Sequence, residues 1–298
     1  MKTTLVPRFS RPEFGPIVHE LGADWKPCSA EWTSLGLITC FCNNKNRRQT
    51  RFFLNGKEIH TDDGNVFHNE TAGPAYEWNG YIGFAGEKGH LLYYSEGKIK
   101  KSFPLMYANT ILEVNGMPHV FDTRDGIINV RHCLTGDTTL TMPGDGIVLQ
   151  ACRHQGKIYA AVADGTRMGG LACSGGSIIQ ADCCQCVVEY LGNLLYSSRN
   201  QIFEAGHVIP LATFDCEKIM YMRVVASKLW IAGANPDTLW CANARGEIIQ
   251  VGRCNDANQQ VGGSCFRVAF ALNPQGTEGY FLRAPNGNQS QSIQLVWR

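Results

Sequence analysis

The chain has 298 residues, of which 44% are hydrophobic and 18% are charged, the composition of an ordinary globular protein that can bury a core. Its 27 basic and 26 acidic residues leave a formal net charge of +1, so we expect no nucleic acid as a partner. The sequence starts without an apolar segment of signal-peptide length and contains no apolar run of about eighteen residues. We therefore expect synthesis in the cytoplasm without a signal peptide, and no membrane insertion.

The first predicted element is a short strand at residues 2–7 (KTTLVP), because this segment closely matches DTTLTMP at residues 137–143. Residues 8–26, 62–73 and 253–263 are rich in Pro, Gly, Asn, Asp and His, and we expect them to be loops. Loops on a rigid scaffold often carry binding groups, so these three segments are the first candidates for a binding surface.

A repeated glycine organises the rest of the chain. Each member follows a short hydrophobic run and precedes another, and successive members are about 40 residues apart, with one interval of about 30. The set is Gly56, Gly97, Gly136, Gly176, Gly206 and Gly246. Upstream of each lies a second tight turn of the kind that closes a hairpin, where positive φ favours glycine. These turns end at Gly36, Gly80, Gly116, Gly156, Gly192 and Ser227. Each unit is therefore predicted to contain four strands joined by hairpins.

Six units are complete, and a seventh near the C-terminus has three strands. The units are predicted at residues 29–62, 74–104, 109–143, 147–182, 185–213, 218–252 and 264–298. The strand missing from the last unit would come from residues 2–7, as the outer strand of that unit. A strand shared between the two ends of the chain would close a ring with a full hydrogen-bond ladder.

Four antiparallel strands about every 40 residues, without helical periodicity, predict an all-β fold. The pattern resembles the seven-bladed β-propeller superfamily across essentially the whole chain. The resemblance is architectural, because the sequence lacks the GH and WD pairs of WD40 repeats, the double glycines of kelch and the SxDxGxTW boxes of sialidase-like propellers. A compact, nearly neutral propeller without these motifs also resembles the small accessory propellers of tailed-phage tails, necks and baseplates.

The chain has 13 cysteines, an odd number, and their spacing does not form the paired CxxC ladders of a zinc site. Most lie inside predicted strands, so we interpret them as small buried hydrophobic residues that stay reduced, with disulfides as the alternative. Cys183, Cys184 and Cys186 form a cluster, but strand alternation would place one thiol opposite the other two. We therefore predict no metal site there.

One polar position recurs just before the first turn of each unit. It holds Glu77, Glu113 and Glu189, with Glu31 close to it and Arg153 at the matching place in the fourth unit. If these side chains face the central channel, a partial ring of carboxylates would hold a cation or a polar ligand. If they face the loop surface, they are solvated, which is the outcome we expect. They are the only ligand-binding candidates that we single out.

No catalytic residue, metal or cofactor is predicted, because the sequence contains no GxSxG elbow, phosphate-binding loop or HExxH motif. The first hypothesis is a non-enzymatic structural propeller that binds protein partners within a larger assembly, such as a virion. The second is a glycan-binding propeller lectin. The third is a metal-dependent hydrolase of the lactonase-like kind, with a cation in the channel.

Overall fold

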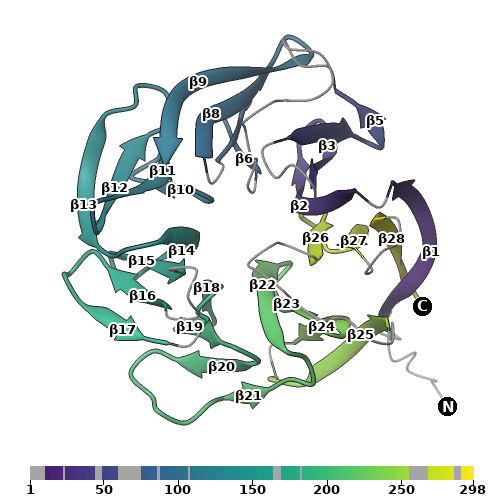
Figure 1. Ribbon diagram of the computed structural model, residues 1–298. Helices are drawn as coiled ribbons and strands as arrows, with labels where there is room; N and C mark the ends of the chain where they lie inside the picture. The colour runs from purple at the N-terminus through teal and green to yellow at the C-terminus, as the bar shows by residue number, and fades with distance from the viewer. Residues whose placement is uncertain are drawn as a thin grey trace, which may run out of the picture.

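The computed structural model describes residues 11–22, 24–43, 49–59, 75–85, 88–106, 108–163, 169–181, 183–243, 245–254, 268–284 and 290–298. These residues form seven four-stranded antiparallel sheets, which stand around a central axis as the blades of a propeller (Figure 1). The predicted all-β, seven-bladed fold class is thus confirmed. Among the described residues there is no helix of the length and apolar character that a membrane-spanning segment needs.

The first four blades follow one another along the chain, each from the innermost strand outward. Blade 1 contains β2 (Trp25–Thr33), β3 (Gly36–Asn43), β4 (Thr50–Leu54) and β5 (Lys57–Glu58). Blade 2 contains β6 (Ala75–Trp78), β7 (Tyr81–Phe84), β8 (Lys88–Ser95) and β9 (Lys98–Met106). Blade 3 contains β10 (Ile111–Val114), β11 (Met117–Arg124), β12 (Ile127–His132) and β13 (Thr138–Pro143). Blade 4 contains β14 (Ile147–His154), β15 (Lys157–Ala163), β16 (Gly169–Cys173) and β17 (Ile178–Gln180).

Blades 5 and 6 continue this order, and blade 7 combines both ends of the chain. Blade 5 contains β18 (Val187–Tyr190), β19 (Asn193–Ser198), β20 (Gln201–Glu204) and β21 (Ala212–Thr213). Blade 6 contains β22 (Lys218–Val225), β23 (Lys228–Ala234), β24 (Asp237–Ala242) and β25 (Ile248–Cys254). Blade 7 is formed by β26 (Val268–Leu272), β27 (Gly279–Arg283), β28 (Ser290–Trp297) and, at its outer edge, β1 (Pro12–Leu21).

The repeated glycines of the sequence lie in the turns that end the strands. All six of the first set have positive φ and stand between the third and fourth strands of blades 1 to 6. In the turn between β6 and β7, Asn79 has φ 45° and Gly80 has φ 77°, which is the two-residue turn that matches the twist of a hairpin. The residues of these turns therefore determine where the strands of each blade end.

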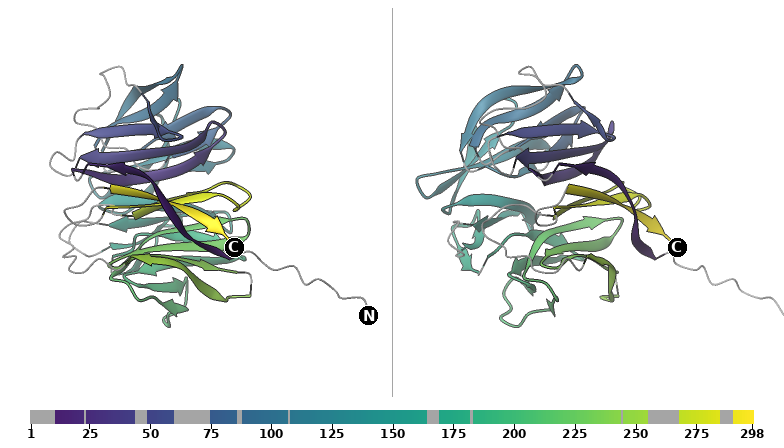
Figure 2. Two further views of the ribbon diagram at one scale, coloured as in Figure 1. Left: turned by 90° about the vertical axis from the view of Figure 1, so that its right-hand side faces the viewer. Right: turned by 45° about the vertical axis from the view of Figure 1, so that its right-hand side comes forward.

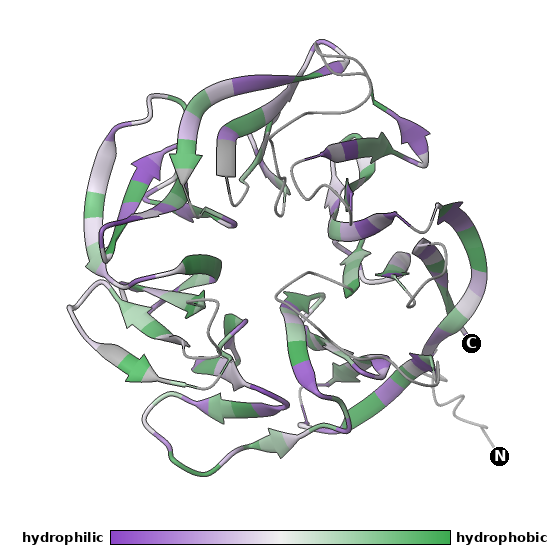
Figure 3. Ribbon diagram, in the orientation of Figure 1, coloured by the Kyte–Doolittle hydropathy of each residue, from purple (hydrophilic) through white to green (hydrophobic). Residues whose placement is uncertain are grey.

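The hydrophobic core is divided into seven clusters, each of which lies between two neighbouring blades. Between blades 1 and 2, for example, the buried rings of Phe52 and Phe84 pack edge to face with their centroids 5.2 Å apart. Hydrophobic segments accordingly occur in all seven sheets (Figure 3). Because every blade contributes to two clusters, removal of one blade face exposes apolar surface on its neighbour.

The ring closes through β1, which pairs antiparallel with β28 from Pro12 opposite Trp297 to Leu21 opposite Ser290. Figure 2 shows β1 crossing the edge of the ring beside the C-terminal strand. The ring of Phe14 in β1 stacks on Phe281 of β27, with centroids 4.9 Å apart. The N-terminal strand therefore belongs to the last blade, as predicted for the fold class.

The position of this strand differs from the sequence prediction. The segment expected to supply it, residues 2–7, lies outside the described residues, and the outer edge of blade 7 is occupied by Pro12–Leu21. Residues 8–26, predicted to be a loop, thus contain β1 and the start of β2. Pro12 and Pro16 suggested a loop, but an outermost strand tolerates proline because one of its edges needs no hydrogen-bond donors. The other two predicted loops fall mostly outside the described residues.

The cysteines are mainly core residues, as interpreted from the sequence. Cys40, Cys184 and Cys186 have no exposed surface, and most of the others are buried or half-buried. One pair departs from the prediction of reduced thiols, since Cys28 and Cys42 on the adjacent strands β2 and β3 form a disulfide.

Candidate functional site

The five candidate side chains of the sequence occupy two repeat positions on the innermost strands. Four of them form what we call the first row, and Glu31 occupies the other position. Glu77, Glu113, Arg153 and Glu189 each occupy the position one residue before the pair that closes the first turn of their blade. Glu31 lies one residue farther from its turn, because the pair that closes the first turn of blade 1 is Thr33 with Gly36. Since neighbouring residues of a strand face opposite sides, Glu31 points to the other side of its blade.

The carboxylates of the first row bind the preceding blade. Glu77 accepts hydrogen bonds from the backbone amide and the hydroxyl of Ser34, in the first turn of blade 1. Glu113 accepts one from the Tyr76 hydroxyl at 3.0 Å. These carboxylates therefore tie successive blades together near their first turns.

The other two members of this row lie in blades 4 and 5. Glu189 lies 3.1 Å from the Nδ1 atom of His154, so it also contacts the preceding blade. Arg153 is exposed on β14. The structure thus places the row around the ring without bringing its members to a common point, and the described residues contain no group of three or more His, Cys, Asp or Glu side chains that could hold a metal ion.

Glu31 forms a half-buried ion pair with Arg223 of β22. The guanidinium meets the carboxylate with two nitrogen atoms, one of them 2.6 Å from the nearer oxygen. The pair joins blades 1 and 6, which are separated by blade 7, and the Arg223 guanidinium lies over the Phe270 ring of that blade at 6.0 Å. Arg223 occupies in blade 6 the position that Glu31 occupies in blade 1, two residues before the closing pair of the first turn.

Burial and mutual attraction act on this pair in opposite directions. Burial raises the pKa of Glu31, and the nearby Arg223 counteracts part of that shift. The pKa of Arg223 is raised, because attraction to Glu31 outweighs the burial that would lower it. Arg223 therefore keeps its charge, and removal of Glu31 would leave a half-buried cation without its counterion.

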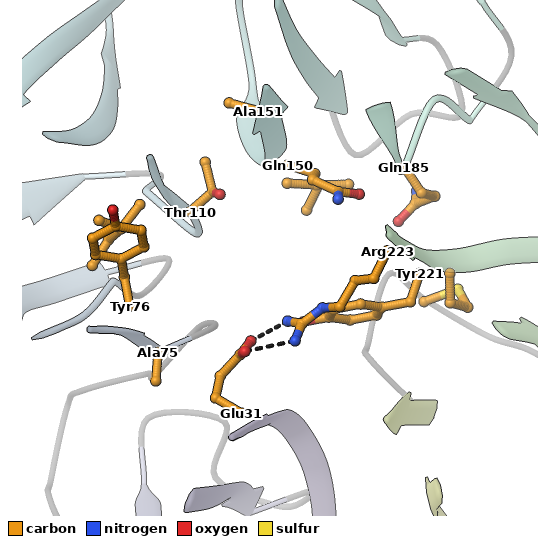
Figure 4. A pocket seen from close by; sticks show the side chains of 12 residues that line it. Glu31, Ala75, Tyr76, Thr110, Gln150, Ala151, Gln185, Tyr221 and Arg223 are labelled. Carbon is orange, nitrogen blue, oxygen red and sulfur yellow. Dashed lines mark hydrogen bonds and ion pairs between the residues drawn. The ribbon is translucent and has the colours of Figure 1, made fainter. Parts of the chain in front are cut away.

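The ion pair borders a cavity of about 200 Å³ in the central channel. Six blades contribute to its lining, and Figure 4 shows the polar side chains of Tyr76, Thr110, Gln150 and Gln185 around it. Gln150 donates a hydrogen bond from Nε2 to the Met222 carbonyl at 2.8 Å, which connects blades 4 and 6. The lining thus combines apolar side chains with hydroxyl and amide groups and one internally neutralised ion pair, and it suits a small uncharged molecule with a few polar groups better than an ion.

A second feature is the uneven distribution of exposed apolar side chains. We call the rim formed by the first and third turns of each blade the turn rim, and the opposite rim, where the chain passes between blades, the connector rim. The described residues include twelve large apolar side chains that are exposed. Nine of them lie in or beside turns of the turn rim: Leu35, Met117, Leu134, Leu191, Val208, Ile209, Leu211, Val224 and Ile248. The other three are Ile17 and Val18 in β1 and Ile127 on the connector rim.

The turn rim also contains a pocket on blade 3 of about 460 Å³. Its lining is Val114, Asn115, Met117, His119, His132, Thr139 and Leu140. Nδ1 of His119 lies 2.9 Å from the Met117 carbonyl and donates to it, and the ring stands edge to face against His132 at 5.4 Å. Burial lowers the pKa of His119, so its ring is neutral at pH 7. Most of this pocket is therefore uncharged and apolar.

The sequence predicted some of these features and missed others. The row of Glu77 and its equivalents was found, and its three carboxylates contact the preceding blade. Arg223 was missed, although its repeat position matches that of Glu31, because the recurring position of the sequence lies one residue closer to the turn, where blade 6 has Val224. The turn rim was missed because exposure of an apolar turn residue cannot be read from composition.

Comparison with known proteins gives the fold and no family. No family model matches the chain, and no curated protein matches it. Among solved structures, a chain in a crystal structure of the mitotic checkpoint complex has a TM-score of 0.58 at 11% identity, over 99% of this chain and 95% of that one. The computationally designed Ika8 protein has a TM-score of 0.52 at 10% identity, over 95% of this chain and 100% of that one. At this identity the similarity concerns the backbone arrangement alone.

Proposed function

We propose that this β-propeller is a non-enzymatic scaffold that binds a protein partner through its turn rim. The observation that carries the proposal is that, among the described residues, nine of the twelve exposed large apolar side chains lie on that rim. Exposed apolar groups gathered on one face are typical of protein-binding surfaces, whereas single ones scattered over a surface are ordinary. The similar chain from the mitotic checkpoint complex is itself part of a protein complex, which supports protein partners for this fold.

The construction of the ring supports the same function. In the described part of the chain, seven apolar clusters between blades and the half-buried Glu31–Arg223 pair hold the turns in fixed relative positions. A rigid surface loses little conformational entropy on binding, so more of the energy from apolar contact contributes to affinity. Short turns on a rigid ring are accordingly suited to a stable interface.

The test is capture of partners by rim variants. Leu191→Asp and Leu134→Asp each place a charge on the turn rim, and Ile127→Asp is the matched control on the connector rim, with 46% exposure against 47% for Leu134. Proteins cross-linked to the tagged chain in extracts of the source organism are quantified by mass spectrometry. We expect the two rim variants to lose one common set of partners that the control keeps. Equal capture by all three variants would contradict the proposal.

For the larger assembly, we propose a virion, in which the propeller is an accessory part of a tail, neck or baseplate. The support is the architectural resemblance to such parts, together with an apolar rim suited to a neighbouring subunit. The chain would be made in the cytoplasm of the host and then incorporated. Mass spectrometry of purified particles tests this proposal, which fails if the chain is found in the cell but not in the particles.

A glycan-binding function is the second candidate, because the channel cavity is lined by hydroxyl and amide groups and has the volume of about one sugar unit. Isothermal titration with monosaccharides would detect it, and Gln150→Leu should abolish the signal. Native mass spectrometry before and after a chelator tests the metal-dependent hydrolase alternative in the same sample, since that function requires one bound cation per chain.

A further inference from the structure

The loop between β20 and β21 presents three exposed apolar side chains, two of which are the most exposed among the described residues of the turn rim. Val208 is 92% exposed, Ile209 is 75% exposed and Leu211 is 57% exposed. Backbone hydrogen bonds from His207 to Glu204 at 3.0 Å and from Leu211 to Ile202 at 2.8 Å fix both ends of the loop. Figure 1 shows the loop at the periphery of the ring, at the lower left. It is therefore an ordered apolar projection, not a frayed end.

The pocket on blade 3 has the complementary chemistry and enough volume for such a projection. Val114, Met117 and Leu140 provide apolar walls, and a volume of about 460 Å³ accommodates two or three aliphatic side chains. The neutral ring of His119, held by the Met117 carbonyl, adds no charge that an apolar occupant would have to desolvate. One chain thus contains both an apolar projection and an apolar pocket.

The two features also have a symmetric placement. Both lie on the turn rim, the projection on blade 5 and the pocket on blade 3, with blade 4 between them. When two rings are stacked with their turn rims facing, a two-fold axis along blade 4 brings blade 5 of each copy onto blade 3 of the other. Both contacts then form at once, as a closed dimer requires.

We propose that the chain forms a symmetric dimer, in which the Val208–Leu211 loop of each copy occupies the blade 3 pocket of the other. The proposal rests on the proposed function in that it uses the same turn rim, and it names a second copy as the occupant. The projection and the pocket are enclosed by their counterparts, so the most exposed apolar side chains of the rim become buried. No loop of the connector rim takes part.

The charges near the axis give the dimer a characteristic dependence on salt. In this arrangement Glu113 of one copy faces Glu189 of the partner copy, and Arg153 lies close to its own symmetry mate. Both glutamates already accept hydrogen bonds within their own chain. Like charges across an apolar interface are screened by salt, so the dimer should become tighter as the ionic strength rises.

Analytical ultracentrifugation of the full chain in reductant tests the proposal. We expect a dimer for the natural chain, with a dissociation constant that decreases in high salt. Val208→Asp/Ile209→Asp and Met117→Asp should each raise that constant at least about tenfold. Val18→Asp, at a position 49% exposed on β1, is the matched control and should leave it unchanged. Thermal melting checks that each variant is folded.

Mixing the loop variant with the pocket variant provides a second measurement. A mixed dimer keeps one intact loop-to-pocket contact, whereas each variant alone has none, so mixing should restore association. A natural chain that stays monomeric up to about 100 μM, open-ended growth with concentration, or dissociation by salt would overturn the proposal. If the chain is monomeric and Leu191→Asp still loses the cross-linked partners, only self-association is overturned. If the chain is monomeric and Leu191→Asp keeps those partners, the proposed function is overturned as well.

Discussion

Alkaline pH should unfold this protein by ionising cysteines that the folded state keeps protonated. Burial raises the pKa of five thiols from 9.0 to about 12. They are Cys40, Cys133, Cys152, Cys184 and Cys216. Because the folded pKa is raised, the unfolded chain releases these protons first, and the stability present below pH 9 is lost as the pH rises toward 12.

The magnitude follows from proton linkage. One pH unit above the ordinary pKa of 9.0, each thiol stabilises the unfolded chain by about 1.4 kcal/mol, and at the ordinary pKa by about 0.4 kcal/mol. Five thiols then lower the free energy of unfolding by about 2 kcal/mol at pH 9 and about 7 kcal/mol at pH 10. Since domains of this kind have about 5–15 kcal/mol, the folded state should be lost near or somewhat above pH 10.

Urea unfolding followed by tryptophan fluorescence, at half-unit steps between pH 7 and pH 10 with a phosphine reductant, measures this dependence. Cys184→Ala should lower the free energy of unfolding at pH 7 through lost packing, but reduce the slope above pH 9 by one proton, about 1.4 kcal/mol per pH unit. A free energy of unfolding that stays constant from pH 8 to pH 10 would refute the reasoning. So would rapid reaction of all the thiols with a disulfide reagent in the folded protein.

Two further predictions concern the ring itself. Glu31→Gln should lower the free energy of unfolding by about 1–3 kcal/mol, because Arg223 stays charged and is only partly exposed to water. Glu31→Leu combined with Arg223→Met should recover most of the loss. A loss below about 0.5 kcal/mol for the single variant in urea unfolding would argue that the pair is as weak as one on the surface. Gly252→Ala should lower the free energy of unfolding by about 1–3 kcal/mol, because the added methyl group would overlap the Phe14 ring of β1. Gly22→Ala is the control and should be neutral in the same assay, since its methyl group would have no atom within 4 Å. Equal effects of the two variants would show that β1 is not packed against Gly252.

Much of the fold could be predicted because its determinants are local. A turn such as Asn79–Gly80 specifies a hairpin within four residues, and its recurrence along the chain gives the number of blades. β1 could not be placed in the same way, since Gly15 and Pro16 interrupt its pattern. Its strand conformation depends on pairing with β28, which is more than 250 residues away in the sequence, and on the packing contacts of Phe14.

The candidate site was less predictable because it depends on contacts between distant residues. Glu31 and Arg223 are 192 positions apart, and only closure of the ring brings them together. The carboxylates of Glu77 and Glu113 were recognisable as a repeat, but their hydrogen bonds to the preceding blade depend on the angle between blades. Exposure on the turn rim follows from which turns project beyond the sheets, a property that hydrophobicity alone does not encode.

The pairing of β1 with β28 has a consequence for protein synthesis. A ribosome makes β1 before the strands of the other six blades and β28 after them, so β1 has no strand to pair with until those blades have been synthesised. During that time Phe14 and the apolar edge of blade 6 that receives it are both uncovered. Such exposure in a nascent chain favours aggregation. A circular permutant that begins at β26, with β28 joined directly to β1, would make blade 7 as one continuous piece and should give more folded protein per chain synthesised.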